Sequence, residues 1–561
     1  MRAHFWLLGG ALLLVGGIWA PSPSLAQATP RSEKSTGKTG QDSGNAKSTG
    51  AGANQAAPET TGAEITLATT SPLDTLDPHL IADNGRTITQ LKFYDALFRW
   101  QSSPVRVVPW LAQSYTRSED GKILRFSLRQ GAIFHDGSPV KASDVVYSVE
   151  RMFALKQGVA PLLAGLLNPG STKAIDDHTV EFSLSRPSTL FLKLLPSIYI
   201  VNAALLKSHE VNNDWGKGWL ARNDAGSGNY ELVSFNPENS LVTRRFAGHW
   251  NKDWAKSPVE TVSVRPITDP DQALDELLKG DIQILDGAML PYQVARVRES
   301  KTAKLLTDTS AQRIFVGLIN ASREPYTTAA GRSLLTQAFD YNAFVTATLG
   351  QAGKRIAMPL PPTLTSQDNT AASNFQKLDL DAARAALAKM KTPIRDVTIG
   401  AILGDLHSER AATILAQGLL KIGIQPHIMT ESWPTVAARM QSDKQMYDVL
   451  FLWQGARYLD PNNWVGELYD CDLFGKGNSS WYCNKEVDGI LKEARNATVS
   501  KARNAGYEKA AQLVAQDNAG LFIAAARNTA AQARTLHDLQ FSPTGESFEL
   551  RRVSVENQKG K

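Results

Sequence analysis

The residues best suited to acid and base chemistry are His135 and Asp136, adjacent in the segment IFHDG. An aspartate followed by glycine is typical of a turn, which favours a structural role over proton transfer. His407 and His427 show no spacing that suggests a metal site. The chain has no HExxH, no G-x-S-x-G and no glycine-rich dinucleotide motif. We therefore predict a protein that is not an enzyme and that needs no cofactor and no metal.

The chain has two cysteines, Cys471 and Cys483, on either side of the turn-rich segment DLFGKGNSSWY. A tetrahedral zinc site needs four ligands, and no second cysteine pair completes one. Cysteines that flank a short loop suit a disulfide in an oxidising compartment, which would stabilise the fold by on the order of 3 kcal/mol. The alternative is a pair of free buried thiols.

Length and composition limit what this chain can be. Its 561 residues exceed one domain, and at roughly 150 residues per domain they predict three to four. Hydrophobic residues make up 42%, which is enough to build packed cores and excludes wholesale disorder. The 60 basic and 55 acidic side chains leave a formal charge of +5, too small a surplus to indicate a nucleic-acid partner.

The first 26 residues have the pattern of a secretory signal peptide. Arg2 gives a basic start, residues 7–20 form an apolar run, and Ser24-Leu25-Ala26 has a small-x-small cleavage pattern. A membrane anchor is disfavoured, because about 14 apolar residues fall short of the roughly 20 that cross a bilayer. Residues 27–63 contain only small, polar and charged residues and predict a disordered linker. We therefore expect a protein exported through the Sec pathway to the periplasm.

Strand patterns and helix patterns alternate along the rest of the chain. AEITLATT, GNYELVSFN and MYDVLFLW have the composition and length of strands. KASDVVYSVERMFAL has helical spacing, with Ser143 in position to cap its start, and DPDQALDELLKG predicts a helix ended by Gly280. The pattern predicts a mixed α/β fold.

The segment VVPWLAQSYTRSEDGKILRFSLRQGAIFHDGSPVKASDVVYSVERM closely resembles the defining stretch of a known family. That family is the peptide, nickel and opine class, family 5, of bacterial extracellular solute-binding proteins, which serve ABC importers. Further matching motifs are Tyr94-Asp95, GSGNYELVSF, and YDVLFLW followed by LDPNNW and WYCNKEVDGILKEA. Together the motifs extend over about residues 63–556.

The resemblance implies an α/β fold of the periplasmic binding protein type, a two-lobed clamshell of class II with mixed sheets and an extra accessory domain. Carried over to this chain, residues 64–97, 224–308 and 534–561 form the core of lobe I. Residues 98–223 form its accessory domain, and residues 309–533 form lobe II.

The resemblance also implies a function: the substrate-binding component of an ABC importer. Such a protein is a monomer that captures a peptide or peptide-like small solute between its lobes and delivers it to a membrane permease, with a separate ATPase supplying energy. The dipeptide-binding branch has a disulfide loop that Cys471 and Cys483 resemble, which supports the oxidised pair. Two other classes stay open, a secreted hydrolase and a non-transport interaction protein on the same clamshell.

The cleft-lining loop of family members corresponds here to QGARYLDP. Peptide binders place in this loop an Asp that pairs with the ligand's α-amino group, whereas the aligned residue here is Arg457, or Ala456 if the gap is placed differently. The Arg that the dipeptide branch uses for the ligand carboxylate is missing from the corresponding segment AILGDLHS. We hypothesise that Arg457 meets an anionic group, because guanidinium matches carboxylate or phosphate. The alternative is that Arg457 turns outward or pairs with Asp460.

Other expected ligand contacts surround this loop. They are Trp433, Trp453, Gln454, Gly455 and Tyr458 on lobe II, and Asp83 and Asn84 of the segment HLIADNGR on the facing lobe. The aromatic side chains are interpreted as walls of the cleft, with a place in the core as the alternative.

Overall fold

The computed structural model describes residues 62–69, 73, 75–80, 92–102, 105–287, 289–308, 313–366, 369, 376–390, 394–497, 499–545 and 547–556. The expected signal peptide, almost all of the expected linker, and Asp83 and Asn84 lie outside the described residues. The described residues belong to one compact unit, Thr60–Lys561. Among them, no helix is both long enough and apolar enough to span a membrane.

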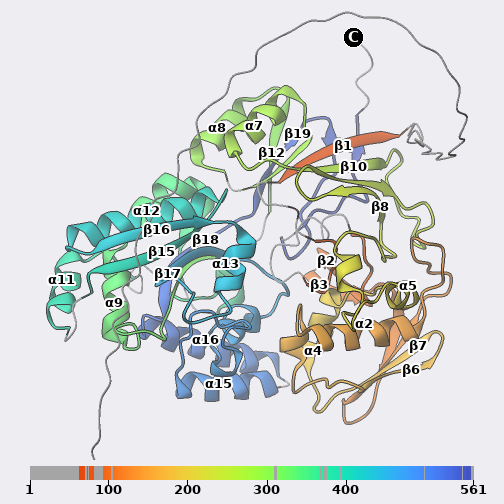
Figure 1. Ribbon diagram of the computed structural model, residues 1–561, viewed down its shortest axis with the longest axis horizontal. Coiled ribbons are helices and arrows are strands. Elements are labelled where there is room, and N and C mark those ends of the chain that lie inside the picture. The colour runs from red at the N-terminus through yellow and green to blue at the C-terminus, as the bar shows by residue number, and fades with distance from the viewer. Residues whose placement is uncertain are drawn as a thin grey trace, which may run out of the picture. The chain divides into compact units, whose positions relative to one another are not determined.

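The first sheet has seven strands within these ranges, in the order β12-β19-β11-β1-β10-β9-β8. Its strands are β1 (Ala63–Thr69), β8 (Tyr230–Asn236), β9 (Ser240–Arg245), β10 (Val259–Pro266), β11 (Ile284–Asp286), β12 (Ala303–Thr307) and β19 (Thr529–Ala533). β1 lies in the middle and pairs in parallel with β10 and β11, which explains its buried Ile65 and Leu67. Helices α7 (Pro270–Lys279) and α8 (Pro291–Glu299) pack against β11, β12 and β19 (Figure 1).

The ends of α7 follow the expected signals. Asp269 caps its start by accepting hydrogen bonds from two backbone amides, and Pro270 occupies its first turn. Gly280 follows its last turn with a φ of 94°, a conformation that glycine adopts without steric cost. The predicted end of this helix is therefore confirmed.

A separate four-stranded antiparallel sheet, counted over the described residues, has the order β4-β5-β7-β6. Its strands are β4 (Ala112–Arg117), β5 (Ile123–Leu128), β6 (Thr172–Asp176) and β7 (Thr179–Ser183). The hairpin of β2 (Phe98–Ser102) and β3 (Val105–Pro109) precedes it. Five helices accompany it, α2 (Ala142–Leu155), α3 (Ala160–Leu163), α4 (Thr189–Leu194), α5 (Ala203–Ser208) and α6 (Lys217–Leu220). Phe126, Phe182 and Phe191 lie at the centre of its core.

Helix α2 begins two positions earlier than the sequence predicted. Lys141, and not Ser143, is the N-cap residue of this helix. The Asp144 carboxylate accepts a hydrogen bond from the Lys141 amide at 2.8 Å, and in this way closes the first turn. Ser143 lies inside that turn because the aspartate after it supplies the capping oxygen.

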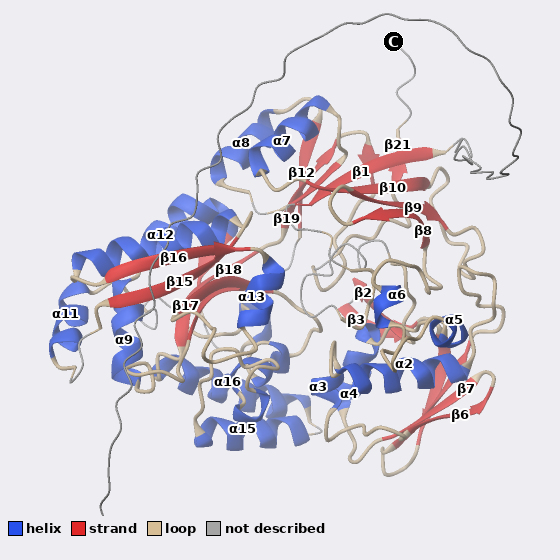
Figure 2. Cartoon of the chain, viewed as in Figure 1, coloured by secondary structure: helices blue, strands red, loops and turns tan. Residues whose placement is uncertain are grey.

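The third sheet has six strands in the described part of the chain, in the order β14-β18-β13-β17-β15-β16. Figure 2 labels β15, β16, β17 and β18 of this sheet. Its strands are β13 (Arg313–Ile319), β14 (Gly353–Arg355), β15 (Asp396–Ile402), β16 (Gln425–Glu431), β17 (Val449–Gln454) and β18 (Gly520–Ala526). The accompanying helices are α9 (Ala329–Ala338), α10 (Tyr341–Phe344), α11 (Leu380–Ala388), α12 (Leu406–Lys421), α13 (Trp433–Arg439), α14 (Gly466–Tyr469), α15 (Lys485–Asn496) and α16 (Ser500–Gln516). A small pair, β20 (Leu536–His537) and β21 (Ser554–Val555), lies near the C-terminus.

We name the seven-stranded part lobe I, the four-stranded part its accessory domain and the six-stranded part lobe II, and propose that these are the three domains. The chain re-enters lobe I at Thr529, because β19 pairs with β11 and β12. The sequence prediction started this last segment of lobe I at residue 534. β18 ends at Ala526, so the chain passes from one buried strand to the next with almost no connection. No turn-rich linker therefore marks this boundary in the sequence.

Candidate functional site

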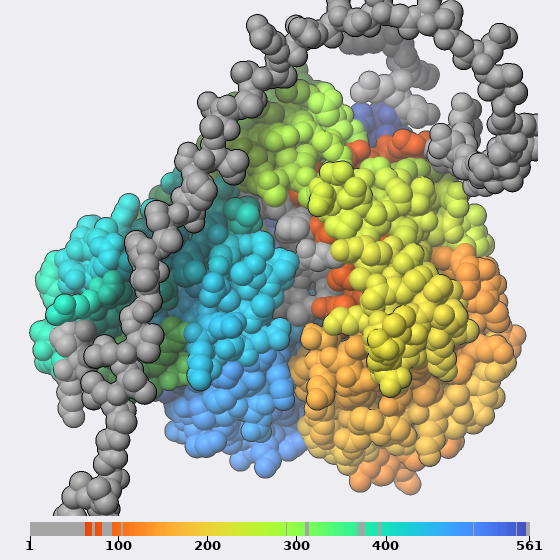
Figure 3. All heavy atoms as spheres, in the orientation of Figure 1, coloured from red at the N-terminus to blue at the C-terminus, as the bar shows by residue number. Residues whose placement is uncertain are grey.

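A cavity of about 510 Å³ is lined by residues from lobe I, from its accessory domain and from lobe II. Its size lies within the range of small-molecule and cofactor sites. The accessory domain and the C-terminal helices of lobe II adjoin on the face shown in Figure 3, in orange and blue. A solute in this cavity would therefore contact more than one domain.

Lobe II contributes the end of β17 and the loop after it. The predicted site residues that line the cavity are Trp433, Trp453, Gln454, Gly455, Ala456 and Arg457. Strand β17 is almost entirely buried between β13 and β15, which holds its C-terminal end in place. The resemblance to the family therefore located this edge of the cavity correctly.

Arg457 pairs with Glu467, which corrects the alternative that paired it with Asp460. The Glu467 side chain is 1% exposed, whereas that of Arg457 is 26% exposed and lines the cavity. Glu467 also accepts a hydrogen bond from the Tyr458 hydroxyl. The guanidinium of Arg457 is thus held at the cavity wall by a buried carboxylate, with part of its charge compensated.

Asp460 is occupied by other partners. Lys193 of α4 approaches its carboxylate at 2.8 Å, and Arg503 of α16 approaches it at 2.6 Å. Burial alone would raise the pKa of Asp460, but the two cations outweigh this effect and hold it below its usual range. Because Lys193 belongs to the accessory domain, this ion pair joins the two lobes.

Tyr458 lies outside the cavity lining, in contrast to the expectation that it walls the cleft. Its ring is fully buried and packs with the core of the accessory domain. Its hydroxyl accepts a hydrogen bond from Asn462 Nδ2 at 2.7 Å, and burial raises its pKa far above the usual range. Tyr458 therefore connects lobe II to the accessory domain, which is the core placement given above as the alternative.

Behind Trp453 lies a set of polar groups that the sequence did not assign to the site. Arg313 stacks on the Trp453 ring at 4.2 Å from its centroid, and Trp453 Nε1 donates a hydrogen bond to His407 Nδ1 at 3.0 Å. Burial lowers the pKa of His407 to about 3, so this imidazole accepts as a neutral group. Asp405, the N-cap of α12, lines the cavity, and burial raises its pKa to about 6.

Lobe I and the hairpin of its accessory domain contribute a wall of aromatic and charged side chains. Asp95 accepts hydrogen bonds from Trp110 Nε1 at 2.6 Å and from Ser227 Oγ at 3.1 Å. Burial would raise the pKa of Asp95, but His249 and the indole donors lower it overall. Arg99 lies over the Trp110 ring, 3.9 Å from its centroid. The sequence motifs around Asp95 and Trp110 had served only to identify the family.

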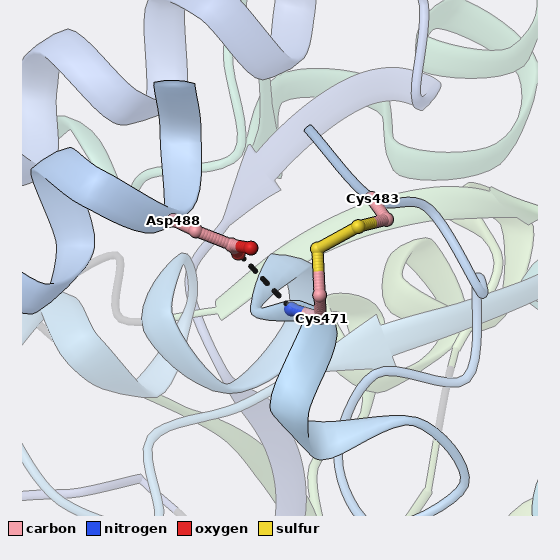
Figure 4. A group of neighbouring side chains, drawn as sticks. All are labelled: Cys471, Cys483 and Asp488. Atoms are coloured by element: carbon pink, nitrogen blue, oxygen red, sulfur yellow. Dashed lines mark hydrogen bonds between the residues drawn. A yellow bond between two sulfur atoms is a disulfide. The ribbon is translucent and has the colours of Figure 1, made fainter. Parts of the chain in front are cut away.

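Cys471 and Cys483 form a disulfide with a Cα–Cα distance of 5.1 Å, which confirms the predicted pair. Asp488 lies beside them and accepts a hydrogen bond from the Cys471 amide at 3.1 Å (Figure 4). These three residues are close enough to resemble a metal site, but the sulfur atoms are bonded to each other and are not thiolate ligands. The loop between the cysteines lines the cavity with Gly475, Lys476 and Gly477.

The suspected acid–base pair is not assembled. His135 Nδ1 lies 2.7 Å from Asp224, whereas Asp136 accepts hydrogen bonds from Ser138 and Asn202. None of these residues lines the described cavity. Asp136 stabilises its own turn, and His135 connects this turn to residues 224–228, in agreement with the structural interpretation.

Comparisons with known proteins agree with this geometry. The sequence model described as bacterial extracellular solute-binding proteins, family 5 (middle), matches residues 106–476. The probable D,D-dipeptide-binding periplasmic protein DdpA of Escherichia coli K12 is 28% identical over 479 residues, covering 84% of this chain and 90% of its own. A di/tripeptide-binding protein of Pseudomonas aeruginosa is 24% identical, covering 81% and 87%.

Solved structures show the same fold. The periplasmic binding protein DppA from Helicobacter pylori, in complex with the peptide STSA, has a TM-score of 0.79 at 20% identity and covers 88% of this chain and 98% of its own. AgaA from Agrobacterium tumefaciens, in complex with agropinic acid, has a TM-score of 0.77 at 21% identity and covers 88% and 99%. The two-lobed periplasmic binding protein fold is thus confirmed. Because the family model spans well over half of the chain, this protein belongs to the bacterial extracellular solute-binding proteins of family 5.

Proposed function

We propose that this chain is the periplasmic substrate-binding component of an ABC importer and captures a peptide or peptide-like solute. Its family consists of solute-binding proteins rather than enzymes. The relatives named above bind dipeptides or tripeptides. The observation that carries the proposal is the cavity lined by both lobes, with Trp453 and Arg457 on one side and Trp110 and Arg99 on the other.

The mechanism follows from binding between hinged domains. A solute that contacts both lobes stabilises the conformation in which they approach each other, in proportion to its differential affinity for that conformation. Closure excludes water, which strengthens the polar contacts to the solute. The Lys193–Asp460 ion pair is made only when the accessory domain and lobe II are in contact, so it adds to the stability of that conformation.

We further propose that a signal peptide at residues 1–26 directs the chain to the periplasm. There, the ligand-loaded monomer would dock on a membrane permease, and a separate ATPase would drive release and import. The periplasmic location of the relatives and the disulfide in lobe II support this assignment.

The proposal is tested by native mass spectrometry of protein purified from its own host, which should retain the solute. Titration calorimetry with peptides and opines should then give heat, and small-angle scattering should give a smaller radius with ligand than without it. A protein that gives neither heat nor compaction with any such solute is not a transport component. Turnover of a bound peptide or ester would instead favour a hydrolase.

A further inference from the structure

The charged side chains that line the cavity are predominantly cationic. Among the described residues of the lining, six are basic, namely Lys92, Arg99, Lys156, Arg313, Arg457 and Lys476. Three are acidic, namely Asp95, Asp405 and Glu549. The basic residues come from lobe I, the accessory domain and lobe II, so the positive charge surrounds the cavity.

The acidic side chains are largely occupied by the protein itself. Asp95 accepts hydrogen bonds from Trp110, Ser227 and Trp250. Glu549 lies 3.9 Å from Lys92 and offsets that one cation. Asp405 accepts a hydrogen bond from the His407 amide at 3.0 Å, and burial raises its pKa to about 6. The six basic side chains still outnumber the three acidic ones, so the lining carries a net positive charge.

Three of the cations have no carboxylate of a described residue within salt-bridge distance. These are Arg99, Lys156 and Lys476, and all three residues are exposed. Glu549, Asp253 and Asp95 act on the charge of Arg99 from farther away. Arg99 is positioned by its stacking on Trp110. Lys156 follows the last turn of α2, and Lys476 lies between two glycines in the disulfide loop.

The disulfide loop holds Lys476 in place. Leu473 O accepts hydrogen bonds from the amides of Lys476 at 2.9 Å and Asn478 at 3.0 Å. Asn478 Nδ2 in turn donates to Tyr482 O at 2.8 Å, inside the loop that the Cys471–Cys483 bond closes. The backbone that carries Lys476 is thus fixed on both sides of the residue.

These charges have a consequence for the solute. When the lobes close over a neutral solute, several cations lose water without gaining a counter-charge, which is energetically costly. A solute with carboxylates supplies the missing charge and forms charge-assisted hydrogen bonds. We propose that the solute of this cavity is anionic, an acidic peptide-like molecule, and that Lys476, Lys156 and Arg99 recognise its carboxylates. This inference rests on the proposed function and adds the charge class of the substrate.

The test is calorimetry of the full mature chain with four tripeptides of equal length: Ala-Ala-Ala, Ala-Glu-Ala, Glu-Glu-Ala and Ala-Lys-Ala. We expect affinity to increase by about tenfold for each added carboxylate, the order expected for a hydrogen bond to a charged group. Lys476→Gln should reduce the advantage of the glutamate peptides by about tenfold. Lys421→Gln, an exposed lysine at the end of α12, is the matched control and should leave the advantage unchanged.

The outcomes separate the two proposals. If the four peptides bind with equal affinity, or the lysine peptide binds best, the charge inference is wrong while the solute-binding proposal stands. If Lys476→Gln retains the full preference, Lys476 is not a recognising residue. If none of the peptides binds, the peptide-like solute class itself is wrong, and the inference falls with it.

Discussion

Removing the disulfide of lobe II should lower stability by an amount that follows from its loop length. The two cysteines are 12 positions apart, and closing a loop of this size restricts the unfolded chain by about 3 kcal/mol. The folded loop keeps its own hydrogen bonds, such as Gly475 N to Asn478 O at 3.1 Å. The cost of Cys471→Ser/Cys483→Ser should therefore arise mainly in the unfolded state.

Differential scanning calorimetry measures this cost. For a unit of roughly 200 residues, such as lobe II, 1 kcal/mol corresponds to about 2–4 °C in Tm. The transition of lobe II should thus move down by about 6–12 °C in the double variant, and wild-type protein in reductant should show the same shift. Reductant added to the double variant is the control and should have no effect.

The reasoning is refuted if the double variant melts within a degree of the wild-type chain. A shift that affects reduced wild type and the variant differently would also contradict it, because both lack the same covalent restriction. If Tm falls as expected but the far-ultraviolet circular dichroism spectrum of the folded variant also changes, the disulfide stabilises the folded loop itself. The value calculated from loop closure in the unfolded chain then does not apply.

Three further predictions concern charged groups. Lys193→Met removes the contact to Asp460 that joins the lobes, so ligand affinity should fall about fivefold, equivalent to about 1 kcal/mol; unchanged calorimetric affinity would show that the pair does not act in closure. Arg457→Ala leaves Glu467 buried without its cation and should lower the free energy of unfolding by about 3 kcal/mol in urea titrations, with much of it recovered in Arg457→Ala/Glu467→Gln; equal losses in both variants would contradict this. Burial, followed by a neighbouring arginine, lowers the pKa of His79 to about 4, so stability should be lost as pH falls from 6.5 towards 4, by up to about 3 kcal/mol. His79→Gln should remove that share of the difference in unfolding free energy between pH 7 and pH 4, and an unaltered difference would rule out this histidine.

The local sequence was sufficient for several elements of the site. The resemblance of the β17 segment and its loop to the family predicted Trp453 through Arg457 at the cavity edge, and these residues line it. The disulfide followed from two cysteines on either side of a turn-rich loop. Such features depend on neighbours in the chain, so composition and spacing report on them directly.

The sequence could not predict in the same way which side chains meet in the folded chain. Arg457 had several carboxylates within ten residues, and only the packing of α14 brings Glu467, rather than Asp460, to its guanidinium. Tyr458 follows Arg457 directly, yet its ring lies in the core of another domain. Whether a side chain of this loop faces the cavity or a neighbouring core depends on which domain packs against the loop. No local sequence pattern encodes that packing.

The amino-acid sequence by itself determined the α/β class, the family, the disulfide and the edge of lobe II that faces the cavity, because each is written in a contiguous motif. Only the tertiary structure decided which charges meet in the cavity. Arg99, Lys156 and Lys476 are distant in the chain, and Lys476 belongs to a different lobe from the other two. They line one space because the sheets and their helices pack together. Side-chain chemistry is encoded locally, whereas the distances between side chains that make a binding site are set by the packing of the whole fold.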